Sequence, residues 1–274
     1  MSSYKNHQLS DNLFIEDTLK ILSEARKNNI VLRVIGALAV KLHSPGYEDL
    51  YAKLKRLGEN NSTFTDIDFV AYSKQRKELV KLFNRMGYTP DMYITAFFGH
   101  RRLLYYHPQK HYHIDIFLDK LEFCHDIFFG NEPGKGRLEI EESTISLADL
   151  VLEKVQIHEI NEKDIKDLII LFHAHNLAET DKPEAINIKY IAKILAEDWG
   201  FWFDATENLK KVLIFAKRYH EEGLITATVF EDISYKIGQL LTVINQEPKT
   251  KAWEKRAKIG TKKKWYRDVE ELIR

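Results

Sequence analysis

The segment Asp66–Tyr72 constrains the fold more than any other part of this chain, because a strand-like sequence there carries two carboxylates. Side chains alternate along a β-strand, so Asp66 and Asp68 project from one face while Ile67 and Phe69 take the other. Two like charges about 7 Å apart on one strand are costly among apolar neighbours unless a cation or hydrogen-bond donors lie between them. The pattern therefore favours a sheet protein that binds a cation.

The front of the chain alternates between helical and strand patterns. Apolar spacing predicts a helix from Asp11 to about Asn28, followed by a β-branched strand, Ile30–Ile35, that Gly36 ends before helical spacing resumes. Another helix follows the carboxylate strand and ends near Gly87, and residues 90–145 have a β-rich pattern. The remaining expected elements are a helical insertion at Glu48–Leu57 and strands at Arg101–Tyr106 and Tyr112–Leu118.

From Ser146 onward the pattern is helical. Ser146 and Asn161 are typical helix N-caps, and the second helix runs to His175. Asp181–Pro183 is the best candidate linker, and no strand is expected after it. Three or four helical stretches are expected beyond the linker, near Asn187–Asp198, Thr206–Glu222, Thr226–Asn245 and Lys262–Ile273.

These elements predict an α+β protein with an α/β front: a mixed sheet flanked by helices, followed by an all-helical C-terminal domain. At 274 residues the chain has room for one large domain or two modest ones. We expect a first domain over residues 1–180 and a helical domain over residues 183–274.

A third carboxylate, Asp115, lies in a second apolar strand, and it converges on Asp66 and Asp68 if the two strands are neighbours. Oxygen ligands without cysteine favour a hard ion such as Mg²⁺. Gly36, between a strand and a helix, would let a phosphate approach the backbone. The alternatives are a solvated edge-strand pair for the first two carboxylates, and for Asp115 an exposed residue paired with His113.

The order of these parts, strand, glycine, helix, Asp-x-Asp strand and a later single Asp, resembles the nucleotidyltransferase superfamily with its polymerase-β-like fold. Gly36-Ala37 matches the superfamily's Gly-Gly or Gly-Ser, with alanine in place of the second residue. Lys154 and the run Lys163, Asp164 and Asp167 resemble a signature of the branch that contains the AbiEii-type toxins. The likeness covers about residues 30–175.

The resemblance implies an enzyme that uses two Mg²⁺ ions to move a nucleoside monophosphate from a triphosphate to a hydroxyl on RNA, protein or a small molecule. Asp66, Asp68 and Asp115 would be the catalytic residues and metal ligands, and Gly36, Ala37 and Lys154 would contact the nucleotide. Relatives carry an arginine just before the Asp pair, which Arg101 or Arg102 would replace here. A toxin–antitoxin component is one role that the branch raises, and a non-catalytic nucleotide- or RNA-binding relative is the alternative.

Other classes of protein find little support. One cysteine, Cys124, cannot form a disulfide within the chain, which favours a reducing, cytoplasmic location, and no span apolar enough for a membrane is expected. The histidines lack the spacing of a zinc site, and neither Cys124 nor Ser62 lies in the sequence context of a hydrolase nucleophile.

Charge is separated along the chain, although 41 basic and 41 acidic residues cancel overall. Residues 249–274 hold 10 basic and 4 acidic residues, so the rest of the chain is acidic. Basic and aromatic residues together can bind a phosphate backbone and stack bases, and a solvated helix face with core aromatics is the other interpretation. The residues expected to contact an RNA acceptor are Lys258, Lys262, Lys263, Lys264 and Trp265.

Overall fold

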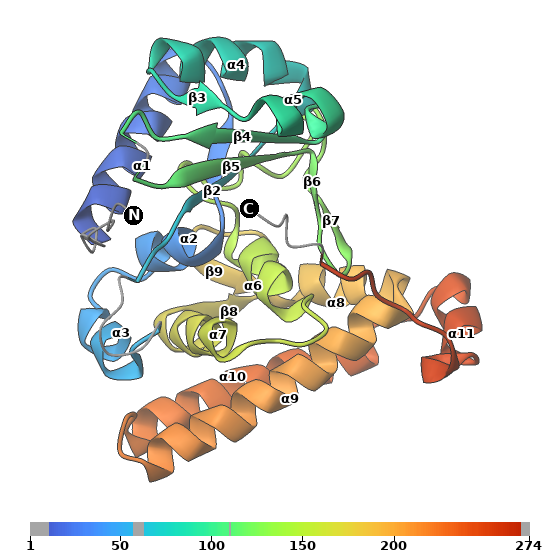
Figure 1. Ribbon diagram of the computed structural model, residues 1–274. Helices are drawn as coiled ribbons and strands as arrows, with labels where there is room; N and C mark the ends of the chain where they lie inside the picture. The colour runs from blue at the N-terminus through green and yellow to red at the C-terminus, as the bar shows by residue number, and fades with distance from the viewer. Residues whose placement is uncertain (1–10, 57–62, 110, 270–274) are drawn as a thin grey trace, which may run out of the picture.

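A five-stranded mixed sheet forms the centre of the front half (Figure 1), in a computed structural model that describes residues 11–56, 63–109 and 111–269. The strand order is β1-β2-β5-β4-β3; β2 and β5 are parallel, and the other neighbours are antiparallel. The strands are β1 (Leu32–Val34), β2 (Ile67–Ala71), β3 (Thr89–Pro90), β4 (Arg102–Tyr106) and β5 (His113–Leu118).

Helices cover the sheet on both sides. α1 (Asp11–Lys27) buries Phe14, Ile21 and Leu22, the helical spacing that predicts it, and contacts β1 and α4 (Arg76–Arg85). A 3₁₀ turn, Ser73–Gln75, precedes α4. The other side is covered by α2 (Gly36–His43), α6 (Leu147–Val155) and α7 (Glu162–Ala174), with α3 (Glu48–Leu54) against α7.

The predicted caps begin their helices as expected. Ser146 accepts a hydrogen bond from the backbone N–H of Asp149, and Asn161 accepts one from that of Asp164. The expected β-rich stretch also contains an unpredicted helix, α5 (Met92–Phe98), which Asp91 caps. Two short strands follow, β6 (Lys120–Glu122) and β7 (Asp126–Phe128), which form a separate antiparallel pair.

The back half is dominated by two long helices that lie side by side, α9 (Trp199–Glu221) and α10 (Ala227–Gln246) (Figure 1). α8 (Ile188–Glu197) packs against both. The prediction that α9 begins at Thr206 is wrong, because the Asp198 carboxylate accepts hydrogen bonds from the first turn and starts the helix at Trp199. One cluster of buried apolar side chains runs through both halves.

The expectation of no strand after the candidate linker is wrong. β8 (Asn176–Ala178) pairs in parallel with β9 (Ala185–Asn187), and the linker connects them. Asp181 within it is bound to Arg137 at 3.1 Å and to Asn187 at 2.9 Å. Three-residue strands are too short to show alternation in the sequence.

The expected helix at Lys262–Ile273 is also wrong over the residues that the structure describes. α11 (Lys251–Ala257) comes earlier than expected, and the chain then makes one 3₁₀ turn, Gly260–Lys262. Residues 263–269 are not helical, and we call them the strap; the end of the expected helix lies outside the described residues. The strap returns to the front half, where Arg267 N–H donates to the Cys124 carbonyl at 3.1 Å.

The result is a protein of mixed α and β class with a mixed sheet and many helices. Within the described ranges, every helix is too short or too polar to cross a lipid bilayer.

Candidate functional site

Three carboxylates lie together on one face of the sheet. β2 and β5 pair in parallel with Asp68 opposite Asp115, so the two side chains are neighbours across the strands. Asp66 immediately precedes β2 on the same face, and its side chain is 38% exposed, whereas that of Asp115 is 5% exposed. The sheet thus brings together the three residues that the sequence singles out, and β2 is an inner strand rather than the edge strand of the alternative interpretation.

Asp68 has a strongly perturbed environment. Burial raises its pKa well above the ordinary value of an aspartate, and the carboxylates of Asp66 and Asp115 raise it further. The buried Glu153 adds to the same effect, and the Arg102 cation opposes it only in part. At Asp68 the effect of the neighbouring carboxylates thus exceeds that of the Arg102 cation, which is an environment that a divalent cation stabilises.

Asp115 is bound to an arginine on the neighbouring strand β4. The Arg102 Nε lies 2.7 Å from Asp115 Oδ1. His113 Nε2 lies 3.4 Å from Asp66 Oδ2 and 3.8 Å from Asp115 Oδ2. Asp115 is therefore a buried residue with Arg102 as its nearest cation, not the exposed residue of the alternative interpretation.

Gly36 faces the carboxylates from the end of β1. Its φ of +70° lies in the left-handed region, which favours glycine, and its N–H donates to Glu153 Oε2 at 3.2 Å. A Cβ at this position would lie 3.5 Å from Asp68 Oδ2. The strand-to-helix turn therefore brings backbone close to the carboxylates, as the sequence predicts.

A cavity of about 220 Å³, which we call the carboxylate pocket, lies between these elements. Gly36 and Ala37 line one side, Asp66 and Asp68 another, and α6 and α7 contribute Glu153, Lys154 and Lys163. Of the predicted nucleotide contacts, Gly36, Ala37 and Lys154 line this pocket, whereas Arg101 and Arg102 do not. Three charged side chains that were not among the predicted site residues also line the pocket: Arg56, Glu153 and Lys163.

Lys154 is fixed by two acids. Its Nζ lies 2.9 Å from Asp164 Oδ1 and 3.0 Å from Asp167 Oδ2, and these carboxylates raise the pKa of Lys154 despite its burial. Burial would raise the pKa of Asp167, but the charges of Lys154 and Arg56 hold it below the usual value. The lysine and the two acids of the branch signature thus form a buried ion-pair network beside the pocket.

Two residues at the pocket escaped the sequence analysis. Arg56 binds Asp167 through its Nε at 2.8 Å and lies ten residues before Asp66, so the chain has an arginine upstream of the Asp pair after all. Glu153 is buried, and burial raises its pKa to about 7. The sequence signal that could have indicated Glu153 is its position next to Lys154 in an otherwise mostly apolar helix, α6, whose residues are all buried in the structure.

The donor set fits a hard cation held by two carboxylates. Asp66 and Asp68 supply oxygens that Mg²⁺ prefers, with phosphate and water completing the coordination. Over residues 11–56, 63–109 and 111–269, no group of three or more His, Cys, Asp and Glu side chains is placed to hold a metal ion. At Asp115 the carboxylate is in contact with the Arg102 guanidinium.

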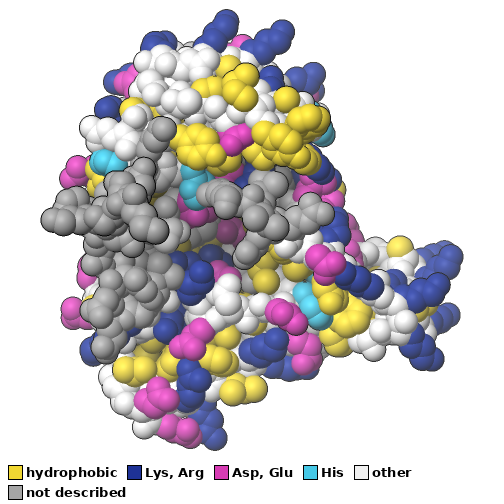
Figure 2. Space-filling view, in the orientation of Figure 1, with side chains coloured by type: hydrophobic (Ala, Val, Ile, Leu, Met, Phe, Trp, Pro, Cys, Tyr) yellow, Lys and Arg dark blue, Asp and Glu magenta, His cyan; other side chains and the backbone are white. Residues whose placement is uncertain are grey.

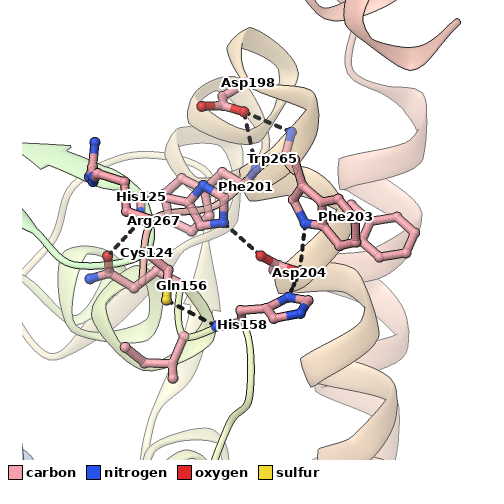
Figure 3. Close-up of polar contacts among 12 residues, drawn as sticks. Cys124, His125, Gln156, His158, Asp198, Phe201, Phe203, Asp204, Trp265 and Arg267 are labelled. Carbon is pink, nitrogen blue, oxygen red and sulfur yellow. Dashed lines mark hydrogen bonds and ion pairs between the residues drawn. The ribbon is translucent and has the colours of Figure 1, made fainter. Parts of the chain in front are cut away.

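The basic C-terminal residues lie away from the carboxylate pocket. Lys and Arg side chains gather over the end of the molecule formed by α11 (Figure 2), and Lys258, Lys262, Lys263 and Lys264 are exposed. Trp265 is instead half-buried, and its Nε1 donates to Asp204 Oδ1 at 3.0 Å (Figure 3). The indole therefore anchors the strap to α9.

Asp204 is the centre of that anchor. It also lies 2.8 Å from His125 Nε2 and 2.8 Å from His158 Nδ1 (Figure 3). Burial would raise the pKa of Asp204, but these hydrogen bonds and that of Trp265 hold it below its usual value. A single buried carboxylate thus joins the strap to two loops of the front half.

Neither a protein-family model nor a curated protein sequence matches this chain. The functional interpretation therefore depends on the geometry of the site.

Proposed function

We propose that the protein is a Mg²⁺-dependent nucleotidyltransferase that moves a nucleoside monophosphate from a nucleoside triphosphate to an acceptor hydroxyl. The observation that carries this proposal is the placement of Asp66, Asp68 and Asp115 on neighbouring parallel strands, opposite the Gly36 turn. A mixed sheet with this strand order supports a nucleotidyltransferase-like fold.

Asp66 and Asp68 would hold the metal, whose chemistry is to balance charge on the phosphates. The first turn of α2 offers backbone N–H groups and the positive end of a helix dipole to the triphosphate. Lys163, exposed at the pocket, supplies a cation for the mobile phosphate tail. Lys154 and Arg56 instead hold α6, α7 and the pocket wall in place.

The acceptor oxygen bonds to the α-phosphorus as the bond to pyrophosphate breaks. The acceptor proton passes to a nearby base, and Asp115 is the carboxylate placed for that task once Arg102 releases it. Release of Asp115 would also complete the ligand set for a second ion.

A non-catalytic nucleotide-binding relative is the second candidate. The Arg102–Asp115 pair favours it, because an arginine that neutralises the third carboxylate permanently would leave the site able to bind a nucleotide but not to transfer it. Transfer activity separates the two candidates.

The test is binding of each nucleoside triphosphate with Mg²⁺, followed by transfer from an α-labelled triphosphate in a cell lysate. We expect wild-type protein to bind and to label one class of acceptor, and Asp68→Asn to lose both. Asp49→Asn, an exposed charge removal on α3, is the matched control and should behave as wild type. Absence of triphosphate binding, or an unchanged Asp68→Asn, would overturn the proposal, whereas binding without transfer supports the non-catalytic candidate.

A further inference from the structure

A second and larger cavity, of about 520 Å³, lies beyond Arg102 and is lined by the strap. One wall comes from β4, β5 and the end of α5; the other comes from strap residues including Lys264 and Tyr266. We call it the strap pocket. Its volume is in the range of small-molecule sites, which run from about 300 to 1,000 Å³.

Three cation–aromatic pairs line the strap pocket. The Arg101 guanidinium lies 5.3 Å from the ring centre of Phe98, and that of Arg102 lies 5.1 Å from the ring centre of Phe117. Lys264 Nζ lies 4.9 Å from the ring centre of Tyr266. Planar guanidinium groups and aromatic rings stack nucleobases, and the same cations attract phosphate.

The charge of the lining favours an anion. Five cationic and two acidic side chains line the strap pocket, whereas three of each line the carboxylate pocket. Arg101 is only loosely paired, with its Nη1 3.5 Å from Glu122 Oε2. Arg102 donates to Asp115 through Nε at 2.7 Å, and its side chain also lines the strap pocket. Lys264 is paired with Asp268, and the two arginines can give a phosphate charge-assisted hydrogen bonds.

The strap is held in place by contacts with α9 and with loops of the front half. Trp265 is bound to Asp204, and the Tyr266 ring stacks on His158 with centres 3.6 Å apart. The backbone N–H of Arg267 is bound to the Cys124 carbonyl, so three consecutive residues fix the strap. The wall is therefore preorganised, which reduces the entropy lost when a ligand binds.

We propose that the strap pocket binds a nucleotide, through its planar base and its phosphate, and that this nucleotide is the acceptor of the transfer reaction. The acceptor role rests on the function proposed above. Arg102 gives the reason for the role, because it contacts Asp115 through Nε and also lines the strap pocket. A nucleotide held by this arginine lies beside the carboxylate that would accept the proton of its hydroxyl. The nucleotide is either free in solution or the end of a single-stranded RNA.

Binding is measured without Mg²⁺ or triphosphate, so that it does not depend on transfer. Probes are a fluorescent nucleoside monophosphate and a labelled single-stranded oligoribonucleotide of about eight residues, read by anisotropy at low salt. We expect Lys264→Glu and Tyr266→Ala each to weaken binding about tenfold, in line with the loss of one stacked or charged contact. The matched control is Lys251→Glu, an exposed charge reversal on α11 outside the strap pocket. It should stay within twofold of wild type.

Binding of the oligoribonucleotide alone identifies an RNA end as the source, and equal affinity for both probes identifies a free nucleotide. Circular dichroism checks that each variant folds, and photocrosslinking of a thiouridine probe to the peptides that contain Phe117 or Tyr266 gives an independent location. The proposal is overturned if wild type binds neither probe, or if Lys251→Glu weakens binding as much as Lys264→Glu. Labelling of a protein acceptor alone also overturns it.

Asp68→Asn separates this proposal from the first one. It should abolish binding of triphosphate with Mg²⁺ and leave binding at the strap pocket unchanged. Loss of both ligands would place the nucleotide in the carboxylate pocket and remove the case for a second site.

Discussion

The carboxylate pocket and the strap pocket differ in charge, in size and in how the chain builds them. The first is small, and its lining balances three acids with three cations; its carboxylates come from the β2 segment and α6, with Asp115 paired opposite Asp68 on β5. The second is cationic and aromatic and joins the sheet to residues about 150 positions later in the sequence. Arg102 stands between them, bound to Asp115 and lining the strap pocket. Carboxylates on one side of this arginine and a mainly cationic cavity on the other suit the proposed transfer between a metal-bound triphosphate and an anionic acceptor.

The largest expected effect tests whether chemistry belongs to the carboxylate pocket alone. Asp68→Asn should lower the rate of nucleotide transfer about 1,000-fold, equivalent to about 4 kcal/mol of transition-state stabilisation, because it removes a metal ligand. Rates with saturating acceptor measure this. An equal loss of transfer rate in Lys264→Glu would show that the chemical step does not depend on the carboxylate pocket alone.

The next largest expected effect is a dependence of the free energy of unfolding on pH, caused by Glu153 in the carboxylate pocket. Its pKa of about 7 is raised by burial, so the folded state binds a proton that the unfolded state releases near pH 4. The free energy of unfolding should therefore fall as pH rises from about 4 to 7, by about 3 kcal/mol from this group. Urea titrations of Glu153→Gln should show a smaller fall than wild type. Parallel curves for the two proteins would contradict the assignment.

A smaller effect is expected where the strap is anchored. Asp204→Ala removes the acceptor of Trp265 and of two histidines and should lower stability by about 2 kcal/mol. Trypsin should then cut more rapidly at the strap lysines, whereas triphosphate binding with Mg²⁺ should be retained. Glu207→Gln, an exposed change on the same helix, is the control. If Asp204→Ala weakened triphosphate binding as well as the anchoring of the strap, the two pockets would not be independent.

The smallest expected effect concerns the arginine between the pockets. Arg102→Gln should raise the affinity for Mn²⁺ in the absence of nucleotide about tenfold, about 1.4 kcal/mol, because Asp115 then joins the metal ligands. Electron paramagnetic resonance of free Mn²⁺ measures this. Arg101→Gln removes the same charge one residue away without touching Asp115, and a similar gain there would show that only net charge matters.

The sequence was sufficient for parts that depend on local rules. The alternation at Asp66 and Asp68 places both on one face, and the caps at Ser146 and Asn161 begin helices as expected. The pairing of Asp115 with Asp68 needed the further assumption that their strands are neighbours. Strand periodicity cannot supply that assumption, because pairing is a long-range property.

What the sequence could not predict depends on distant contacts. Arg102 was expected near the phosphates, but the antiparallel pairing of β4 with β5 brings it to Asp115. Trp265 was expected to contact RNA within a helix, yet Asp204, 61 residues earlier, holds it in an extended strap. In both cases a charged or polar group is buried beside a partner that is distant in the sequence. A local sequence pattern does not predict such a contact.

The strap also sets the order in which the two pockets can form during synthesis. Translation delivers the N-terminal end first, so β1, β2 and β5 emerge long before residues 263–269. A product that stops at α11 would carry every carboxylate of the first pocket and lack one wall of the second. Such a truncated chain is expected to capture triphosphate without an acceptor.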